Sequence, residues 1–118
     1  MRTRAAACRR GGDWRAWLTG FGRALRNAFA AHRDGARLCA IAPPLAAVEG
    51  AADAIAAPLM ARGLPRAAAI AYQASVISLT LGWSLYEANG PMHAFLDEMM
   101  DTAAAYETGL AALVAGFT

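Results

Sequence analysis

The 118-residue chain contains no lysine, two cysteines, two histidines and few β-branched residues. Two cysteines cannot form a disulfide framework, and Cys8 and Cys39 match no metal-ligand spacing. His32 and His93 lie far apart in the sequence, and no phosphate-binding loop, His/Cys cluster or serine elbow occurs. We therefore predict no metal, no cofactor and no catalytic residues, and expect a protein that is not an enzyme. No charged and then apolar leader opens the chain, so we expect a cytoplasmic location.

Alanine is the most abundant residue, with 32 of 118 positions, and 58% of all residues are hydrophobic. Alanine is the strongest helix former, whereas β-branched residues favour strands. The chain length suits one domain. We predict an all-α domain over residues 13–118, preceded by a flexible basic lead-in at residues 1–12.

The charges are distributed unevenly along the chain. Residues 1–37 carry nine of the eleven arginines against two acidic residues, whereas residues 38–118 carry two arginines against seven acidic residues. This asymmetry is compatible with nucleic-acid contact, an interdomain face or self-association. We interpret the arginines of the first helix, Arg15, Arg23, Arg26 and Arg33, as its solvent-exposed face.

Apolar periodicity and helix-breaking residues predict a bundle of antiparallel helices. The expected helices cover residues 14–32, 44–62, 65–88, 92–100 and 102–117, with a short helical turn at 36–42. Pro58 is expected to kink or interrupt the second long helix, and Gly63 to end it.

The helix predicted at residues 65–88 carries two seams. Small residues recur at steps of three and four at Ala68, Ala71, Ser75, Ser78 and Gly82, and large residues recur similarly at Tyr72, Val76, Leu79, Trp83 and Tyr86. Small residues let another helix approach closely, and large residues fill or line an interior. Residues 67–86 contain no charge, but Gln73 and several hydroxyl residues favour a helix buried in a bundle over a membrane span.

Three stretches together carry a family resemblance. They are RALRNAF followed by HRDGAR at residues 23–37, Gly63-Leu64 followed by a helix containing Thr80-Leu81-Gly82, and YETGLAALVAGF at residues 106–117. In this order they resemble the effector-binding C-terminal domain of the tetracycline-repressor (TetR) family of transcription regulators, over residues 14–117. The matching family features are a (Y/H)RDGA(K/R) turn, a TLG segment and a closing F-x-x-G-L-x-x-L-I-x-G-F pattern.

The resemblance implies a homodimer in which the central and last helices of two subunits form a four-helix bundle. The expected interface comprises Ala68, Ala71, Ser75, Ser78, Gly82, Tyr106, Gly109, Leu110, Leu113, Val114 and Phe117. The family's helix-turn-helix domain has no counterpart in the sequence, so DNA contact would need a separate N-terminal part. The chain is then a truncated regulator, a fragment or a stand-alone effector-binding module.

The sequence departs from the family where drug-binding members support a magnesium ion. Cys39 and Ser78 stand at the positions of two histidines, and Ala42-Pro43-Pro44 replaces a Thr-Arg-Pro run. Loss of these ligands disfavours magnesium–tetracycline, and the remaining candidates favour a hydrophobic effector. The expected ligand-binding residues are Trp17, Phe21, Leu25, Cys39, Met60, Tyr72, Gln73, Val76, Leu79, Trp83 and Tyr86.

Two functions from different classes follow. The first is a small-molecule-binding and dimerisation domain of a TetR-like repressor. The alternative is a stand-alone interaction protein that uses the same seam to heterodimerise with a full-length regulator and titrate it.

Overall fold

The predicted helical character is confirmed. A computed structural model describes residues 13–32, 34–36 and 50–118, and this part of the chain contains helices and turns but no strand. The helices are α2 (Asp13–Ala31), α4 (Ala51–Met60), α5 (Arg66–Ala88), α6 (Gly90–Met99) and α7 (Thr102–Gly116). The expected lead-in at residues 1–12 and the helical turn at 36–42 fall on residues that are wholly or mostly outside the described ones.

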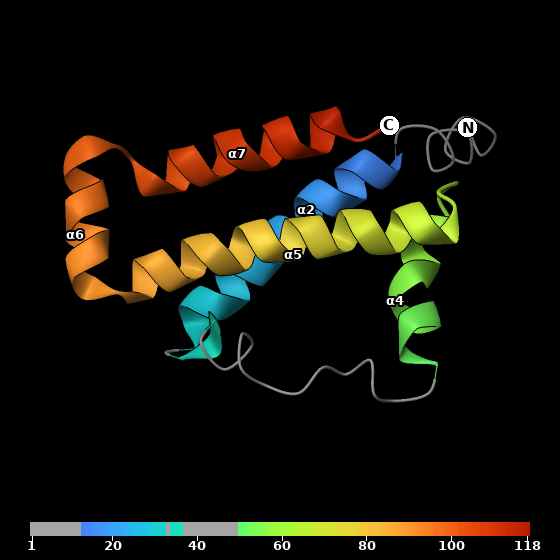
Figure 1. Cartoon of the computed structure of the whole chain (residues 1–118), viewed down its shortest axis with the longest axis horizontal. Coiled ribbons are helices and arrows are strands. Elements are labelled where there is room, and N and C mark those ends of the chain that lie inside the picture. The colour runs from blue at the N-terminus through green and yellow to red at the C-terminus, as the bar shows by residue number, and fades with distance from the viewer. Residues whose placement is uncertain (1–12, 33, 37–49) are drawn as a thin grey trace, which may run out of the picture.

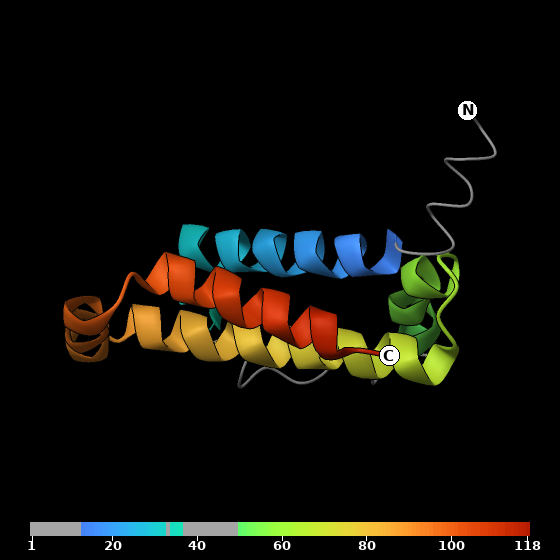
Figure 2. The ribbon, with the colours of Figure 1, turned by 90° about the horizontal axis from the view of Figure 1, so that it is seen from above.

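Three long helices, α2, α5 and α7, lie side by side and form the body of the molecule (Figures 1 and 2). The short helix α6 crosses one end and links α5 to α7, and α4 lies at the other end. α5 and α7 are antiparallel, as predicted, but α2 crosses α5 while running in the same general direction. α4 lies at the end of the molecule at which α2 begins, so α5 starts from that same end.

The observed boundaries of α5, α6 and α7 agree with the predicted ones to within two residues. Asn89 caps α6, since its side-chain Oδ1 accepts a hydrogen bond from the Met92 amide. Asp101 caps α7 in the same way, accepting from the amides of Ala103 and Ala104. These caps explain why α6 begins after Asn89 and α7 after Asp101, close to the positions predicted from the sequence.

Pro58 does not interrupt its helix, contrary to one form of the prediction. α4 continues through Pro58 to Met60. The missing N–H of Pro58 removes a single hydrogen bond, and Pro58 already lies in the last turn of the helix. Gly63 then ends the segment with a positive φ of 103°, a conformation that glycine adopts without strain.

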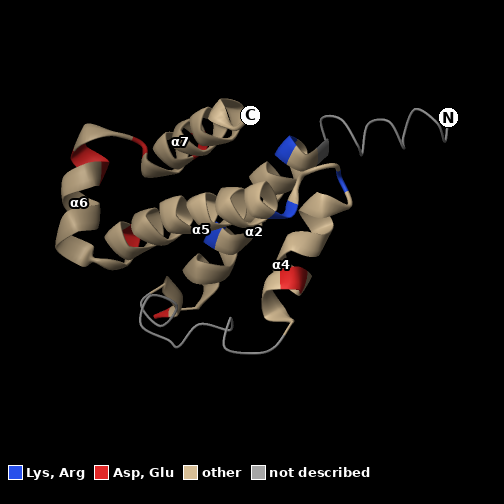
Figure 3. Ribbon diagram, turned by 45° about the vertical axis from the view of Figure 1, so that its right-hand side comes forward, with Lys and Arg blue, Asp and Glu red and all other residues tan. Residues whose placement is uncertain are grey.

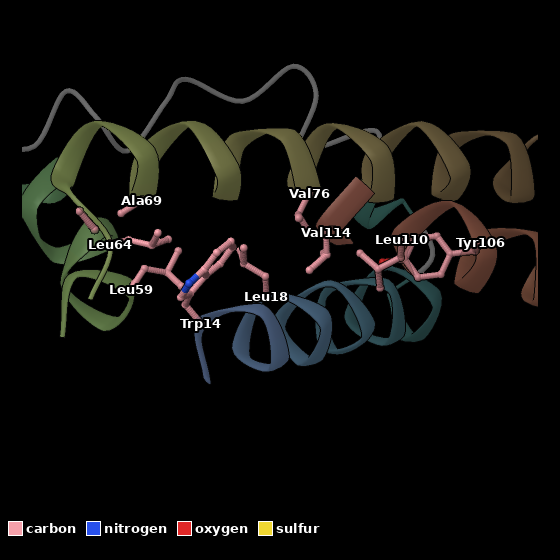
Figure 4. Packing of buried hydrophobic residues seen from close by; sticks show 10 residues of the cluster. Trp14, Leu18, Leu59, Leu64, Ala69, Val76, Tyr106, Leu110 and Val114 are labelled. Carbon is pink, nitrogen blue, oxygen red and sulfur yellow. The ribbon is translucent and has the colours of Figure 1, made fainter. Parts of the chain in front are cut away.

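The core lies between α2, α4, α5 and α7 (Figure 4). It is made of ten buried apolar residues: Trp14, Leu18, Ala56, Leu59, Leu64, Ala69, Val76, Tyr106, Leu110 and Val114. The three long helices approach closely at Gly22, where an added Cβ would lie 2.9 Å from the Tyr106 hydroxyl and 3.1 Å from carbon atoms of Leu110 and Val76. A glycine at this position therefore lets α2 reach both α5 and α7.

The face that α5 buries differs from the large seam predicted for it. Its buried residues are Ala69, Gln73, Val76, Thr80 and Ser84. Three of them are polar, and two of those have partners: Gln73 donates to the Ile55 carbonyl at 2.6 Å, and Thr80 pairs with the Tyr106 hydroxyl at 2.8 Å. Hydrogen bonding removes the cost of burying these groups, so polar residues occupy a line that hydrophobicity alone assigns to large side chains.

α5 is, by length and composition, apolar enough to cross a membrane, although a single such helix is weak evidence. In this structure it packs against α2, α4, α6 and α7.

Candidate functional site

A hollow of about 700 Å³ opens between the C-terminal parts of α2 and α5. Drug-sized ligands occupy pockets of about 300–1,000 Å³, so the hollow has the volume of a small-molecule site. Its walls combine apolar and polar side chains: Arg26, Phe29, Ala30, Asp34, Ser84, Leu85, Glu87, Ala88 and Asn89.

Two helices end at this hollow. Phe29 and Ala30 belong to the last turn of α2, and Leu85, Glu87 and Ala88 to the last turn of α5. The carbonyl groups at a helix C-terminus carry partial negative charge, which basic residues often neutralise. Neither last turn contains a basic residue. Figure 3 shows acidic residues near the ends of both helices, and the charged residues that line the hollow are Asp34, Glu87 and Arg26.

An ion pair joins the two walls of the hollow. Arg26 on α2 binds Glu87 on α5 through two hydrogen bonds, of 2.6 and 3.2 Å, and both side chains are mostly buried. The Arg26 guanidinium also lies 5.1 Å from the centre of the Tyr106 ring, within the range of a cation–π interaction. Glu87 thereby neutralises the arginine, and within the described part of the chain no ion pair neutralises Asp34.

Ser84 is the one buried side chain among the described residues whose polar atom lacks a hydrogen-bond partner. It lines the hollow and is only 7% exposed. An unpartnered buried hydroxyl costs about 1–3 kcal/mol of stability. The structure thus leaves an unpartnered buried hydroxyl on a residue that borders this hollow.

A hydrogen-bonded polar cluster lies next to the hollow on α7. Burial raises the pKa of the Tyr106 hydroxyl, and its hydrogen bond with Thr80 partly opposes this shift. Arg23 binds Glu107 at 2.6 and 2.9 Å and lowers the pKa of that carboxyl. A smaller hollow of about 160 Å³ is lined by Arg23, Arg26, Asn27, Tyr106 and Glu107.

Of the arginines of α2 that were predicted to form a solvated face, Arg23 is exposed, whereas Arg15 and Arg26 are half-buried. Arg23 and Arg26 pair with acidic residues of α7 and α5, and Arg15 donates to the Phe117 carbonyl at 2.7 Å. Arg33 lies outside the described residues. The positive charge of this segment is therefore used largely to join α2 to the other long helices.

Of the residues predicted to bind a ligand, none of the ten that are described lines either the hollow of about 700 Å³ or the smaller one of about 160 Å³. Trp17 stacks on Phe21 of the same helix, with ring centres 5.2 Å apart. Tyr72 stacks between Trp14 and Phe117, at 5.6 and 4.1 Å.

The remaining predicted ligand-binding residues are dispersed. Val76 and Gln73 are buried in the core, Leu25 and Leu79 are half-buried, Met60 and Tyr86 are exposed, and Trp83 meets Tyr86 edge-on. Cys39 lies outside the described residues. The two aromatic stripes are satisfied by contacts with neighbouring side chains, which corrects the expectation that they enclose a space together.

The residues predicted for the dimer interface divide into two groups. On α5, Ala71 and Ser78 are exposed, whereas Ala68, Ser75 and Gly82 are half-buried, so the chain itself covers this small seam only in part. On α7, Tyr106, Leu110 and Val114 lie in the core of the chain itself, and Gly109, Leu113 and Phe117 are half-buried. The expectation that Tyr106, Leu110 and Val114 face a second subunit is therefore wrong, because they are already covered by α2 and α5.

Sequence reasoning missed the hollow because its residues form no motif. The available signal was physical: Ser84 continues the line of Ala69, Gln73, Val76 and Thr80 at helical spacing, and it is polar without an evident partner. Among the described residues no group of three or more His, Cys, Asp or Glu side chains could hold a metal ion.

The fold and the comparisons define the class of protein. The family model described as "Tetracyclin repressor-like, C-terminal domain" matches residues 9–100, and the chain belongs to this family. This is a regulatory kind of domain, not a catalytic one. Searches of curated proteins and of solved structures give no match.

Proposed function

We propose that the chain is the effector-binding and dimerisation domain of a TetR-like transcription regulator, acting in the cytoplasm and contacting DNA only through a separate domain. Residues 13–118 form this domain. A hydrophobic small molecule is the expected class of effector, and no catalytic step is part of the function. The observation that carries the proposal is the outward face of α5.

This face is suited to close contact with another helix. The hydroxyls of Ser75 and Ser78 donate to the carbonyls of Ala71 and Ala74 within the helix, both at 2.9 Å. The seam therefore offers no unsatisfied polar group. A Cβ added at Gly82 would have nothing within 4 Å, so the single chain leaves this position open. Small residues of this kind allow helix axes to approach closely.

The exposure of α5 supports a missing partner. Within its most apolar stretch 28% of the residues are buried in the chain, and Ala71, Ala74 and Ser78 lie exposed. Exposed apolar surface on a helix marks a contact site for a partner. The adjacent α7 exposes small residues at Ala104, Thr108, Ala111 and Ala115. A second copy of the chain would cover both helices and form a four-helix bundle.

The proposal is tested by changing the open glycine. Gly82→Arg places a long charged side chain on the proposed interface, and we expect sedimentation analysis to show monomer where the unchanged chain is a dimer. Gly20→Arg is the matched control. Gly20 is also helical, exposed and without neighbours within 4 Å of an added Cβ, but it lies on α2 away from the small seam.

The control variant should remain dimeric and fold normally. A Gly82→Arg chain that sediments as the same dimer as the Gly20→Arg chain would contradict the proposed interface. Monomer in all three proteins would contradict dimerisation itself.

The interaction-protein alternative uses the same surface with a different partner. It is favoured by the exposed apolar side chains of α6, which has no buried residue and exposes Met92, Phe95 and Met99, and by Met100, which follows the helix and is also exposed. Co-purification with a longer member of the family, lost in Gly82→Arg and kept in Gly20→Arg, would support it. A homodimer that binds small molecules supports the sensor.

A further inference from the structure

We propose that the outward face of α6 is a docking surface for a basic amphipathic helix of another protein. The surface consists of Met92, Phe95 and Met99 on α6 and of Met100 directly after the helix. The proposal goes beyond effector binding and dimerisation, because it concerns neither the hollow nor the face of α5 and α7 that is assigned to a second copy.

α6 turns its apolar side chains away from the rest of the chain. Met92, Phe95 and Met99 recur at steps of three and four, which places them on one face of the helix. Phe95 and Met99 are each 57% exposed, and no residue of α6 is buried. An amphipathic helix normally covers such a face with its own core. Adjacent exposed apolar side chains of this kind mark a site at which another molecule binds.

The side chains of this surface suit the apolar face of a helix. Three of the five methionines of the chain lie at positions 92, 99 and 100. Methionine is unbranched and polarisable, so it adapts its shape to different neighbours. Methionine-rich surfaces are used to bind amphipathic helices of varied sequence, and an aromatic ring such as that of Phe95 gives the contact a large apolar anchor.

The charge around the surface selects a basic partner. Asp97, Glu98 and Asp101 are all exposed, and residues 86–101 contain no Lys or Arg. Figure 3 shows the acidic colouring of α6 at this end of the molecule. The ion pairs of Arg23, Arg26 and Arg66 are made with other acidic residues. A partner that carries arginine or lysine beside its apolar residues therefore complements both the apolar face and its acidic surroundings.

The same charges disfavour the two other occupants of an exposed apolar helix face. Helices that lie on membranes carry Lys and Arg on their polar face and are attracted to anionic lipids, whereas α6 carries Asp97 and Glu98. A second copy that met α6 with its own α6 across a two-fold axis would bring these acidic residues together.

Three labelled peptides test the chemistry of the partner by fluorescence anisotropy. The basic probe is a peptide of about five helical turns made of Leu, Ala and Arg, with Leu on one face. The acidic peptide has Glu in place of every Arg, and the scrambled peptide keeps the basic composition without the apolar face. We expect the basic peptide to bind the full chain about tenfold or more tightly than either control, with an affinity that falls as salt is added.

One apolar substitution tests the place of binding. Phe95→Ser should weaken the basic peptide about fivefold or more, because it removes the aromatic anchor. Since Phe95 is exposed, the melting temperature should stay close to that of the unchanged chain. Ile55→Ser is the matched control, because Ile55 is also exposed but lies on α4 at the other end of the molecule. It should leave peptide binding unchanged.

A pair of charge variants tests the acidic surroundings. Asp97→Asn combined with Glu98→Gln should weaken the basic peptide about threefold or more and reduce the effect of salt. Asp53→Asn combined with Glu107→Gln removes the same number of charges from α4 and α7 and should have little effect. Equal weakening by the two double variants would show a response to net charge alone and would overturn the assignment to α6.

The remaining outcomes separate the possible occupants. Binding of the basic peptide that is weakened in Phe95→Ser and kept in Ile55→Ser supports the proposal. A lower sedimenting mass in Phe95→Ser alone would assign the surface to a second copy. Binding to vesicles of phosphatidylcholine and phosphatidylserine that is lost in Phe95→Ser would assign it to a membrane. Either result overturns the proposal, as does equal binding of the three peptides or no binding of the basic one.

Discussion

The two halves of α5 lie against different surroundings. Near its start, Ala69, Gln73 and Val76 are covered by α2 and α4, and the amide of Gln73 is hydrogen-bonded to the Ile55 carbonyl. Near its end, Ser84 is buried without a partner, and Leu85 and Glu87 border an open hollow. In the first half of α5 the buried amide of Gln73 is hydrogen-bonded. In the second half the Ser84 hydroxyl has no partner, and the helix borders an open hollow.

Buried polar groups are nearly always hydrogen-bonded. The end of α5 departs from this rule at Ser84. We therefore expect this end of the bundle to contribute less to stability than the other.

The largest expected effect is on the free energy of unfolding, when one leucine from each region is replaced by alanine. Leu59 is fully buried in the packed half, and Leu59→Ala should lower the free energy of unfolding by about 2–5 kcal/mol. Leu85 is half-buried at the hollow, and Leu85→Ala should cost about 1 kcal/mol or less. Urea unfolding of both variants measures the difference. Equal losses would show that the two regions are packed alike.

A smaller effect is expected at the buried hydrogen bond between Thr80 and Tyr106. Either Thr80→Val or Tyr106→Phe leaves one partner buried and unsatisfied, at a cost of about 1–3 kcal/mol. The double variant removes both polar groups and should lose less than the sum of the single losses. Additive losses would contradict a direct interaction between these hydroxyls.

The sequence predicted most of the architecture because helix boundaries are local. Gly63, Asn89 and Asp101 mark the ends of helices through backbone conformation and capping, which depend on neighbouring residues alone. The same signals identify α5 and α7 as long helices that lie next to each other.

The side chains that each helix buries were predicted less well. Burial depends on partners that are distant in sequence, as Thr80 and Tyr106 show, and on close approach at Gly22. Large residues such as Tyr72 and Trp83 were assigned to a cavity, but they form stacked or edge contacts with other rings. The hollow has no sequence motif because it is created by the ends of two helices rather than by a run of residues.

An intermediate effect is expected at the ion pair that joins the walls of the hollow. Glu87→Gln keeps the shape of the side chain but leaves the mostly buried Arg26 without a countercharge. We expect a loss of about 1 kcal/mol, between the values for exposed and fully buried pairs. Thermal unfolding at low and high salt measures it, and a more stable Glu87→Gln protein would contradict a stabilising pair.

The smallest effect concerns the exposed pair of Arg23 and Glu107. Arg23 lowers the pKa of Glu107, so the pair contributes stability above the carboxyl's unfolded pKa of about 4 and loses it as the pH falls through the lower folded value. The difference in melting temperature between the unchanged chain and Glu107→Gln should therefore narrow from pH 6 to pH 3. A difference that widens on acidification would contradict this assignment.

The central claim is that a second copy of the chain covers the outward face of α5. Sedimentation equilibrium of the unchanged chain over a range of concentrations tests it most directly. We predict the mass of two chains of 12.3 kDa each. The mass of a single chain at every concentration would contradict the account.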